Sequence, residues 1–262
     1  MAAKNAIFDS YDLQDANIIL TKIEHDTIPA RELKRYRIVR GDGELITDNR
    51  YGAKRIVLIG RVQGSSTTDL ESRLDTLRAN IVGYDKINKT LEIEYNGTTR
   101  NYTATCVNIN IDRRNGTINF AEFQIEFIST TPFGKAPSSS NLLTSTAQTT
   151  SPNSKAITVA GTAERQKLVI TVELNSFTGA VANTITLKNN DTNYAISVSR
   201  AWVAADVLEI DVENFSVKVN GTDVDYSGAF PDFAPGSRTL VYSDDFTARN
   251  VDIKVSQVAR YL

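Results

Sequence analysis

The sequence is poor in the residues from which catalytic and metal sites are most often built. It contains one cysteine and one histidine in 262 residues. A single cysteine, Cys106, excludes an intramolecular disulfide and a cysteine-based zinc cluster. The lone histidine, His25, could act as a general base only for a nucleophile, and the sequence contains no Gly-x-Ser-x-Gly nucleophile elbow and no activated cysteine. We therefore interpret His25 as a solvated or capping loop residue. We therefore expect no enzyme, no cofactor and no metal site.

Paired carboxylates are the other route to catalysis that the sequence offers. Asp223 with Asp225 and Asp244 with Asp245 are close in sequence, and glycosidases use two carboxylates that flank a sugar. Aspartate is also common in turns, where its side chain accepts hydrogen bonds from nearby backbone N–H groups. Because nothing in the sequence places either pair in a cleft, we interpret both as turn residues rather than as catalytic or calcium-binding residues.

Long apolar runs and an excess of one charge are also lacking. No apolar run approaches the roughly 18 residues of a membrane span, and the first residues lack the apolar core of a signal peptide. Hydrophobic residues make up 41% and the formal net charge is −2, which argues against disorder and against a nucleic-acid-binding polycation. We expect a protein assembled in the cytosol, with no membrane span and no sequence-specific nucleic acid partner.

The length and one polar stretch predict two domains. A chain of 262 residues is long enough for two ordinary domains. Residues 138–152 are rich in Ser, Thr and Pro and cannot bury enough apolar surface to fold alone. The sequence therefore predicts a first domain over residues 1–137, a linker over 138–152 and a second domain over 153–262.

The sequence predicts that the first domain is mainly β with one helix. Thr68 and Glu71 form a capping box, and an apolar stripe at helical spacing follows; its members are Leu70, Leu74, Leu77 and Ile81. A meander comes next, with a hairpin turn at Asn96-Gly97. Phe120 and Phe123 are three residues apart, so we expect a β-bulge near Ala121-Glu122. The expected fold is a split β-barrel or curled sheet closed by one helix.

The second domain shows about eight short strands separated by turn residues and no helical periodicity. This pattern is typical of a jelly-roll or related β-sandwich. The whole chain is therefore predicted to be mainly β.

Two groups of residues are candidate binding residues. A local excess of basic residues lies between positions 31 and 61, and its first members are Arg31, Lys34, Arg35, Arg37 and Arg40. A solvated face and an ion-paired subunit interface are the two competing interpretations; little aromatic interleaving accompanies the charges, which argues against nucleic acid binding.

The other group is aromatic. Trp202 is the sole tryptophan, and Tyr194 and Tyr226 lie in the same predicted sandwich. Core packing is the simpler interpretation for Trp202, because a single aromatic residue between strands normally fills a core. The sharper hypothesis is that the three rings stack on a glycan.

The order of turns and strands resembles a known family. The segments that carry the resemblance are Ile185 to Asn189, Ala205 to Asp211, Val217 to Gly221, Gly228 to Ser237 and the terminal Arg260 to Leu262. In the first half, the strand Arg55 to Gly60, the helix and the Pro132-Phe133 exit fit as well. The chain resembles the distal tail proteins (Dit family) of long-tailed siphophages. Ala205 and Ser237 depart from the usual Gly and Asn of that pattern.

The resemblance implies a structural virion protein at the phage tail tip, assembled in the host cytoplasm. It implies a homohexameric ring, formed by the first domain, that connects the tail tube to the tail-tip hub and baseplate used for host attachment. The second domain would be galectin-like or a jelly roll. Implied partners are the tail tube, hub and tape measure proteins, with receptor-binding proteins as further candidates, and the basic residues 31–40 become the candidate subunit interface. The alternative is a carbohydrate-binding, lectin-like adsorption protein.

Overall fold

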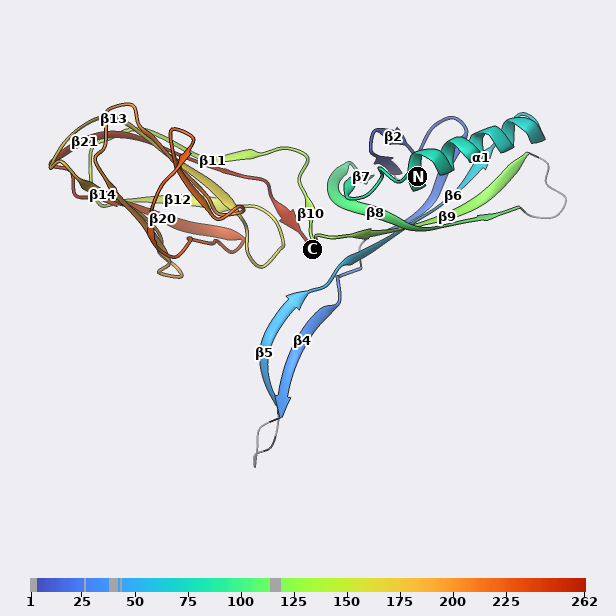
Figure 1. Ribbon diagram of the computed structural model, residues 1–262, viewed down its shortest axis with the longest axis horizontal. Helices are drawn as coiled ribbons and strands as arrows, with labels where there is room; N and C mark the ends of the chain where they lie inside the picture. Colours follow the sequence, from blue (N-terminus) through green and yellow to red (C-terminus); the bar gives the residue numbers. More distant parts are fainter. Residues whose placement is uncertain (1–3, 26, 38–41, 43, 114–118) are drawn as a thin grey trace. The chain divides into compact units, whose positions relative to one another are not determined.

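A computed structural model describes residues 4–25, 27–37, 42, 44–113 and 119–262. The chain divides into two compact units, which are Met1–Pro137 with Leu262, and Ser138–Tyr261. We call these the first unit and the second unit, and Figure 1 shows the elements of each. Almost every element is a strand, and the described residues contain one helix. The prediction of a mainly β chain with one helix is confirmed.

The first unit is built on an antiparallel sheet with the strand order β2-β1-β7-β8-β9-β6-β3, and β10 pairs with β8. The path has two different ends, β2 and β3, so the sheet is open and does not close into a barrel. The bounds of its strands are β1 (Lys4–Phe8), β2 (Tyr11–Asp12), β3 (Ile18–Glu24), β6 (Lys54–Gln63), β7 (Lys89–Tyr95), β8 (Thr98–Asp112), β9 (Phe120–Ser129) and β10 (Gly134–Lys135).

Strand β9 alternates without interruption, so the predicted bulge at Ala121-Glu122 is wrong. Its register with β6 is continuous from Gln63↔Phe120 to Lys54↔Ser129. Ala121 and Phe123 are both buried, so Ala121 holds the inward position that the sequence pattern assigned to Phe120. The irregularity lies instead in β8, between Cys106 and Asn108.

The turn between β7 and β8 has the predicted form. Tyr95 pairs with Thr98 across it, and Asn96 and Gly97 have φ angles of 53° and 74°. Positive φ at both central residues is what a two-residue type I′ turn requires.

Helix α1 (Thr67–Val82) packs its apolar stripe into the core of the first unit, as predicted. The predicted capping box is displaced by two residues. Ser66 is the N-cap, and its Oγ accepts a hydrogen bond from the Asp69 N–H at 3.2 Å. The Asp69 carboxylate accepts one from the Ser65 N–H at 2.7 Å. That bond, together with the Arg73 guanidinium, holds the pKa of Asp69 below its usual range.

Replacing Ser66 by alanine is expected to destabilise the first unit by about 1 kcal/mol, because an orphan N–H at the start of α1 loses its acceptor. Denaturant titration of the full chain, followed by far-ultraviolet circular dichroism, measures the loss. Ser72→Ala is the matched control, since Ser72 is exposed within the same helix and alanine is the better helix former there. An equal loss in both variants would contradict the assignment of the cap.

The second unit is a sandwich of two antiparallel sheets, which confirms the predicted β-sandwich. One sheet has the order β11-β21-β13-β16-β17-β18 and the other β12-β20-β14-β15-β19. The bounds are β11 (Ser140–Gln148), β12 (Asn153–Val159), β13 (Leu168–Thr178), β14 (Asn183–Asn189), β15 (Ala195–Arg200), β16 (Val207–Asp211), β17 (Ser216–Val219), β18 (Thr222–Asp223), β19 (Ser227–Gly228), β20 (Gly236–Asp244) and β21 (Ala248–Gln257). Strand β22 (Arg260–Tyr261) belongs to neither of these two sheets.

The predicted linker is wrong, because most of it is a strand of this sandwich. Strand β11 pairs with β21 from Ser140↔Gln257 to Gln148↔Val251. It is an edge strand of its sheet, where polar side chains are tolerated on the open side. Leu142 and Leu143 pack against the core of the second unit. The sandwich thus begins well before residue 153.

Strands β4 (Arg31–Arg37) and β5 (Glu44–Tyr51) form a separate two-stranded sheet. Their register runs from Arg31↔Tyr51 to Arg37↔Glu44. Figure 1 draws them as a hairpin of two long ribbons. We call this hairpin the arm.

Candidate functional site

The arm carries the residues that the sequence proposed as a subunit interface. Arg31, Lys34, Arg35 and Arg37 all lie on β4, and every residue of that strand is exposed. Arg40, the fifth residue of the prediction, lies outside the described residues. The structure thus brings four of the five basic residues onto one strand.

The arm also exposes large apolar side chains. Leu33, Tyr36, Leu45 and Ile46 have exposed fractions of 37%, 48%, 57% and 54%. Among the described strands, β4 and β5 pair only with each other, and an isolated two-stranded hairpin is at best marginally stable in water. Apolar groups gathered on such an element indicate a surface that a partner covers.

Two basic side chains of β4 make contacts within the arm. The Arg31 Nη2 donates to the Tyr51 hydroxyl at 2.7 Å, with the guanidinium 5.0 Å from the Tyr51 ring centre. Arg35 lies 3.7 Å from Glu44. An exposed ion pair such as that of Arg35 with Glu44 contributes little to stability.

The three proposed glycan-stacking residues do not form one platform. Trp202 is 7% exposed and belongs to the core of the second unit, where its Nε1 donates to the Asn183 carbonyl at 2.9 Å. Core packing is therefore its role, and glycan stacking on Trp202 is wrong. Tyr194 and Tyr226 are half-exposed, and the Tyr226 ring packs edge-on against Phe230 at 5.3 Å.

His25 is mostly buried, which corrects the expectation of a solvated loop residue. Its ring packs edge-on against Tyr95, with the ring centres 5.6 Å apart. Within the described ranges, no cluster of three or more His, Cys, Asp or Glu side chains is arranged to hold a metal ion. Over the same residues, no helix has the length and apolar content needed to cross a membrane.

The two carboxylate pairs have different surroundings. Asp244 is buried and accepts a hydrogen bond from the Arg249 Nε at 2.8 Å, and Asp245 accepts one from the Thr184 N–H at 2.8 Å. Both side chains thus make contacts within the second unit, and Asp244 is the last residue of β20 rather than a turn residue. Asp223 and Asp225, in contrast, line a groove, which could not be predicted from the sequence.

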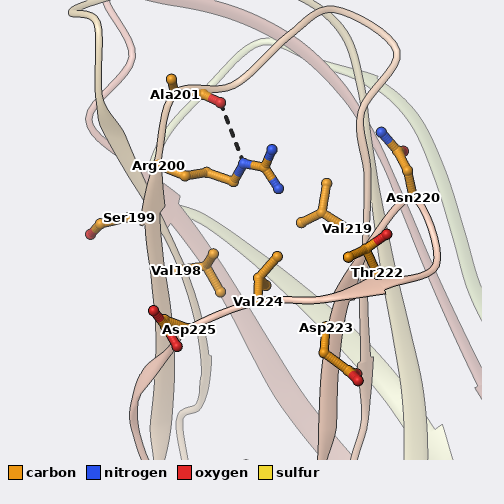
Figure 2. Close-up of a pocket in the computed structure, with 10 residues that line it drawn as sticks. All are labelled: Val198, Ser199, Arg200, Ala201, Val219, Asn220, Thr222, Asp223, Val224 and Asp225. Atoms are coloured by element: carbon orange, nitrogen blue, oxygen red, sulfur yellow. Dashed lines mark hydrogen bonds between the residues drawn. The ribbon is translucent and has the colours of Figure 1, made fainter.

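This groove, of about 710 Å³, lies in the second unit between the end of β15 and the β17–β18 hairpin. Figure 2 shows the Arg200 side chain extending toward Val219, with Val198 and Val224 between it and the two carboxylates. The Arg200 guanidinium lies 5.5 Å from the Trp202 ring centre, and its Nε donates to the Ala201 carbonyl at 3.3 Å. An apolar floor is thus bordered by charges of both signs.

Arg200 is the groove residue that the sequence did not single out. A lone basic residue at a strand end carries no pattern, and Arg200 and Asp223 are on different sheets. None of the ten residues that line the groove is aromatic, so a sugar ring would find no face to stack on there.

Most of the second unit matches a known protein family. Residues 160–258 match the family described as siphovirus-type tail component, C-terminal domain. No curated protein matches the sequence.

Solved structures match nearly the whole chain. The crystal structure of the Dit protein of phage SPP1, described as a paradigm of the hub adsorption apparatus in phages that infect Gram-positive bacteria, aligns with a TM-score of 0.69. The identity is 15%, and the alignment covers 99% of this chain and 100% of that one. A chain of the phage P2 baseplate in its activated conformation with Ca aligns over the same shares, with 11% identity and a TM-score of 0.46. The SPP1 match shows a shared fold.

Proposed function

We propose that the protein is a structural component of the phage tail tip, a distal tail protein that forms a hexameric ring, because residues 160–258 match the siphovirus-type tail component family. The observation that carries the proposal is the fold shared with the SPP1 Dit protein along 99% of this chain. The ring would connect the tail tube to the tail-tip hub and the host-adsorption apparatus. Assembly would take place in the host cytoplasm, and the role is structural rather than catalytic.

The two units would have different roles in the tail tip. The first unit would form the ring, with the arm as the contact between neighbouring subunits. Its exposed apolar residues, such as Leu45 and Ile46, support this assignment, and so do its basic residues Arg35 and Arg37. Tail tube, hub and tape measure proteins would meet the ring, and receptor-binding proteins are further candidate partners. A closed ring also covers strand edges that a monomer exposes.

The proposal predicts a closed particle of six chains. Light scattering after size-exclusion chromatography of the full chain is expected to give a mass of about 173 kDa, six times the 28.9 kDa of one chain. Electron microscopy of the same fraction is expected to show rings with sixfold symmetry. A monomer at all concentrations would contradict the ring, and a closed ring of another size would contradict the number six.

A further inference from the structure

The groove of the second unit has an open strand edge along one side. Strand β15 pairs with β14 along its whole length, from Lys188↔Ala195 to Asn183↔Arg200. On its other edge it pairs with β19 only at Ile196 and Ser197. The chain between β18 and β19 passes from one sheet to the other. The edge of β15 beyond Ser197 therefore has no neighbouring strand among the described residues.

The backbone groups on this edge can be assigned from the hydrogen bonds beside it. The Ala229 N–H donates to the Ala195 carbonyl at 2.8 Å, and the Asn189 N–H donates to the Tyr194 carbonyl at 2.9 Å. In an antiparallel sheet, the N–H and C=O of one residue point to the same side, and successive residues alternate. Ala195, Ser197 and Ser199 therefore face away from β14. The N–H and C=O of Ser199 point to the groove, where no strand meets them.

The side chains around this edge offer both charges and an apolar floor. Val198 and Val219 are buried, and Val224 packs against the same core. The Asp223 and Asp225 carboxylates make no ion pair or hydrogen bond with a described residue, and the terminal nitrogens of Arg200 make none either. Two unpaired carboxylates against one guanidinium leave the groove with a negative excess.

We propose that this groove binds an extended polypeptide segment of a partner protein, which adds as a strand beside Ser199 of β15 and carries a Lys or Arg side chain to Asp223 and Asp225. Strand addition to an open edge gives affinity through main-chain hydrogen bonds, and side-chain pockets give specificity. The apolar floor takes one side chain, and the residue two positions along, on the same face of the added strand, reaches the carboxylates. An anionic group of the segment can pair with Arg200.

Two substitutions of Ser199 separate the backbone contribution from the side chain. Ser199→Pro removes the N–H that faces the groove and leaves the ladder with β14 intact, because proline is tolerated where the N–H of an edge strand faces outward. Ser199→Ala is the matched control, since both variants lose the hydroxyl contact with Thr184 at 2.7 Å. The double substitution Asp223→Asn with Asp225→Asn tests the charges.

The probe is a surface-displayed library of random nonapeptides, selected against the full-length protein, from which the enriched peptides are synthesised. We expect these peptides to alternate apolar and polar residues and to carry a Lys or Arg. Their affinity should fall about tenfold or more in Ser199→Pro and in the Asp double variant, and should stay within about twofold in Ser199→Ala.

Three outcomes would overturn the proposal: no enriched peptide, enriched peptides that bind Ser199→Pro as well as the parent protein, or a glycan-array signal that the Asp double variant abolishes. Circular dichroism reports whether each variant is folded. If Ser199→Pro does not fold, the Asp double variant decides alone, because both carboxylates are on exposed residues. Unchanged peptide binding in that variant would refute the groove as the site.

Discussion

Reversing the charge of Arg35 and Arg37 to glutamate is expected to abolish ring assembly of the full chain and to leave each subunit folded. Both side chains are exposed on β4, so their loss removes no core contact. Truncating one partner of a charge pair that is buried and hydrogen-bonded in an interface typically costs about 2–5 kcal/mol, and in the proposed ring both side chains are in such pairs. Two such losses per contact weaken association by about a thousandfold or more. Light scattering should then report a monomer of 28.9 kDa.

The matched control makes the same change of charge in the second unit. Arg165 and Lys254 are exposed and pair with Asp232 and Glu173 at 3.1 Å and 3.7 Å. Replacing both by glutamate changes the net charge equally but leaves the arm untouched. The control should still assemble. A ring that forms normally with Glu at positions 35 and 37 would remove these residues from the interface.

The structure of the arm is itself an argument for a binding partner, and this argument does not depend on the similarity to phage tail proteins. Its two strands pair only with each other among the described strands, and they place no described residue in either core cluster. A hairpin with exposed Leu and Ile gains stability only when another surface covers them. The ring proposal supplies such a surface from a neighbouring subunit.

Elements in which apolar residues recur at a regular spacing could be predicted from the sequence. The residues at which these elements begin and end could not. The stripe of α1 is fixed by its spacing, because four apolar side chains at helical intervals can be buried only on one face. The cap is ambiguous, since Ser66 with Asp69 and Thr68 with Glu71 fit nearly the same pattern. Only the packing of the helix selects Ser66, whose Oγ meets the Asp69 N–H.

The linker prediction failed because composition alone does not distinguish a polar edge strand from a linker. Residues 140–148 contain mostly Ser, Thr, Asn and Gln, which is also the composition of a linker. An edge strand needs few apolar residues, because one of its edges and one of its faces stay open. Leu142 and Leu143 were the available signal, and they are too few to form a recognisable alternation.

The groove could not be predicted because it depends on pairing between distant strands. Arg200 and Asp223 come together only when the two sheets are packed. A single sequence likewise cannot tell which way Trp202 points, inward to the core or outward to a ligand. In the structure, its indole N–H finds the Asn183 carbonyl, which stabilises the inward position.

The buried ion pair of the second unit is the other place where a single substitution should have a large effect. The Asp244 Oδ1 accepts hydrogen bonds from the Arg249 Nε at 2.8 Å and from the Phe246 N–H at 2.9 Å. The side chains of Asp244 and Arg249 are 0% and 12% exposed. Burial, and then the nearby Asp244 carboxylate, raise the pKa of Tyr242 far above its ordinary value. This environment is therefore poorly hydrated, and a lone charge in it is costly.

Arg249→Met is expected to destabilise the second unit by about 3–5 kcal/mol, because it leaves the Asp244 carboxylate buried without its counter-charge. Adding Asp244→Asn should recover part of that loss, since the amide carries no charge to desolvate. Urea titration followed by fluorescence reports on this unit, because the sole tryptophan, Trp202, lies in its core. Lys254→Met is the control: Lys254 pairs with Glu173 at 3.7 Å on the surface of the same unit, and its loss should cost less than about 1 kcal/mol. Equal losses in Arg249→Met and Lys254→Met would show that burial of the Asp244 pair makes no difference.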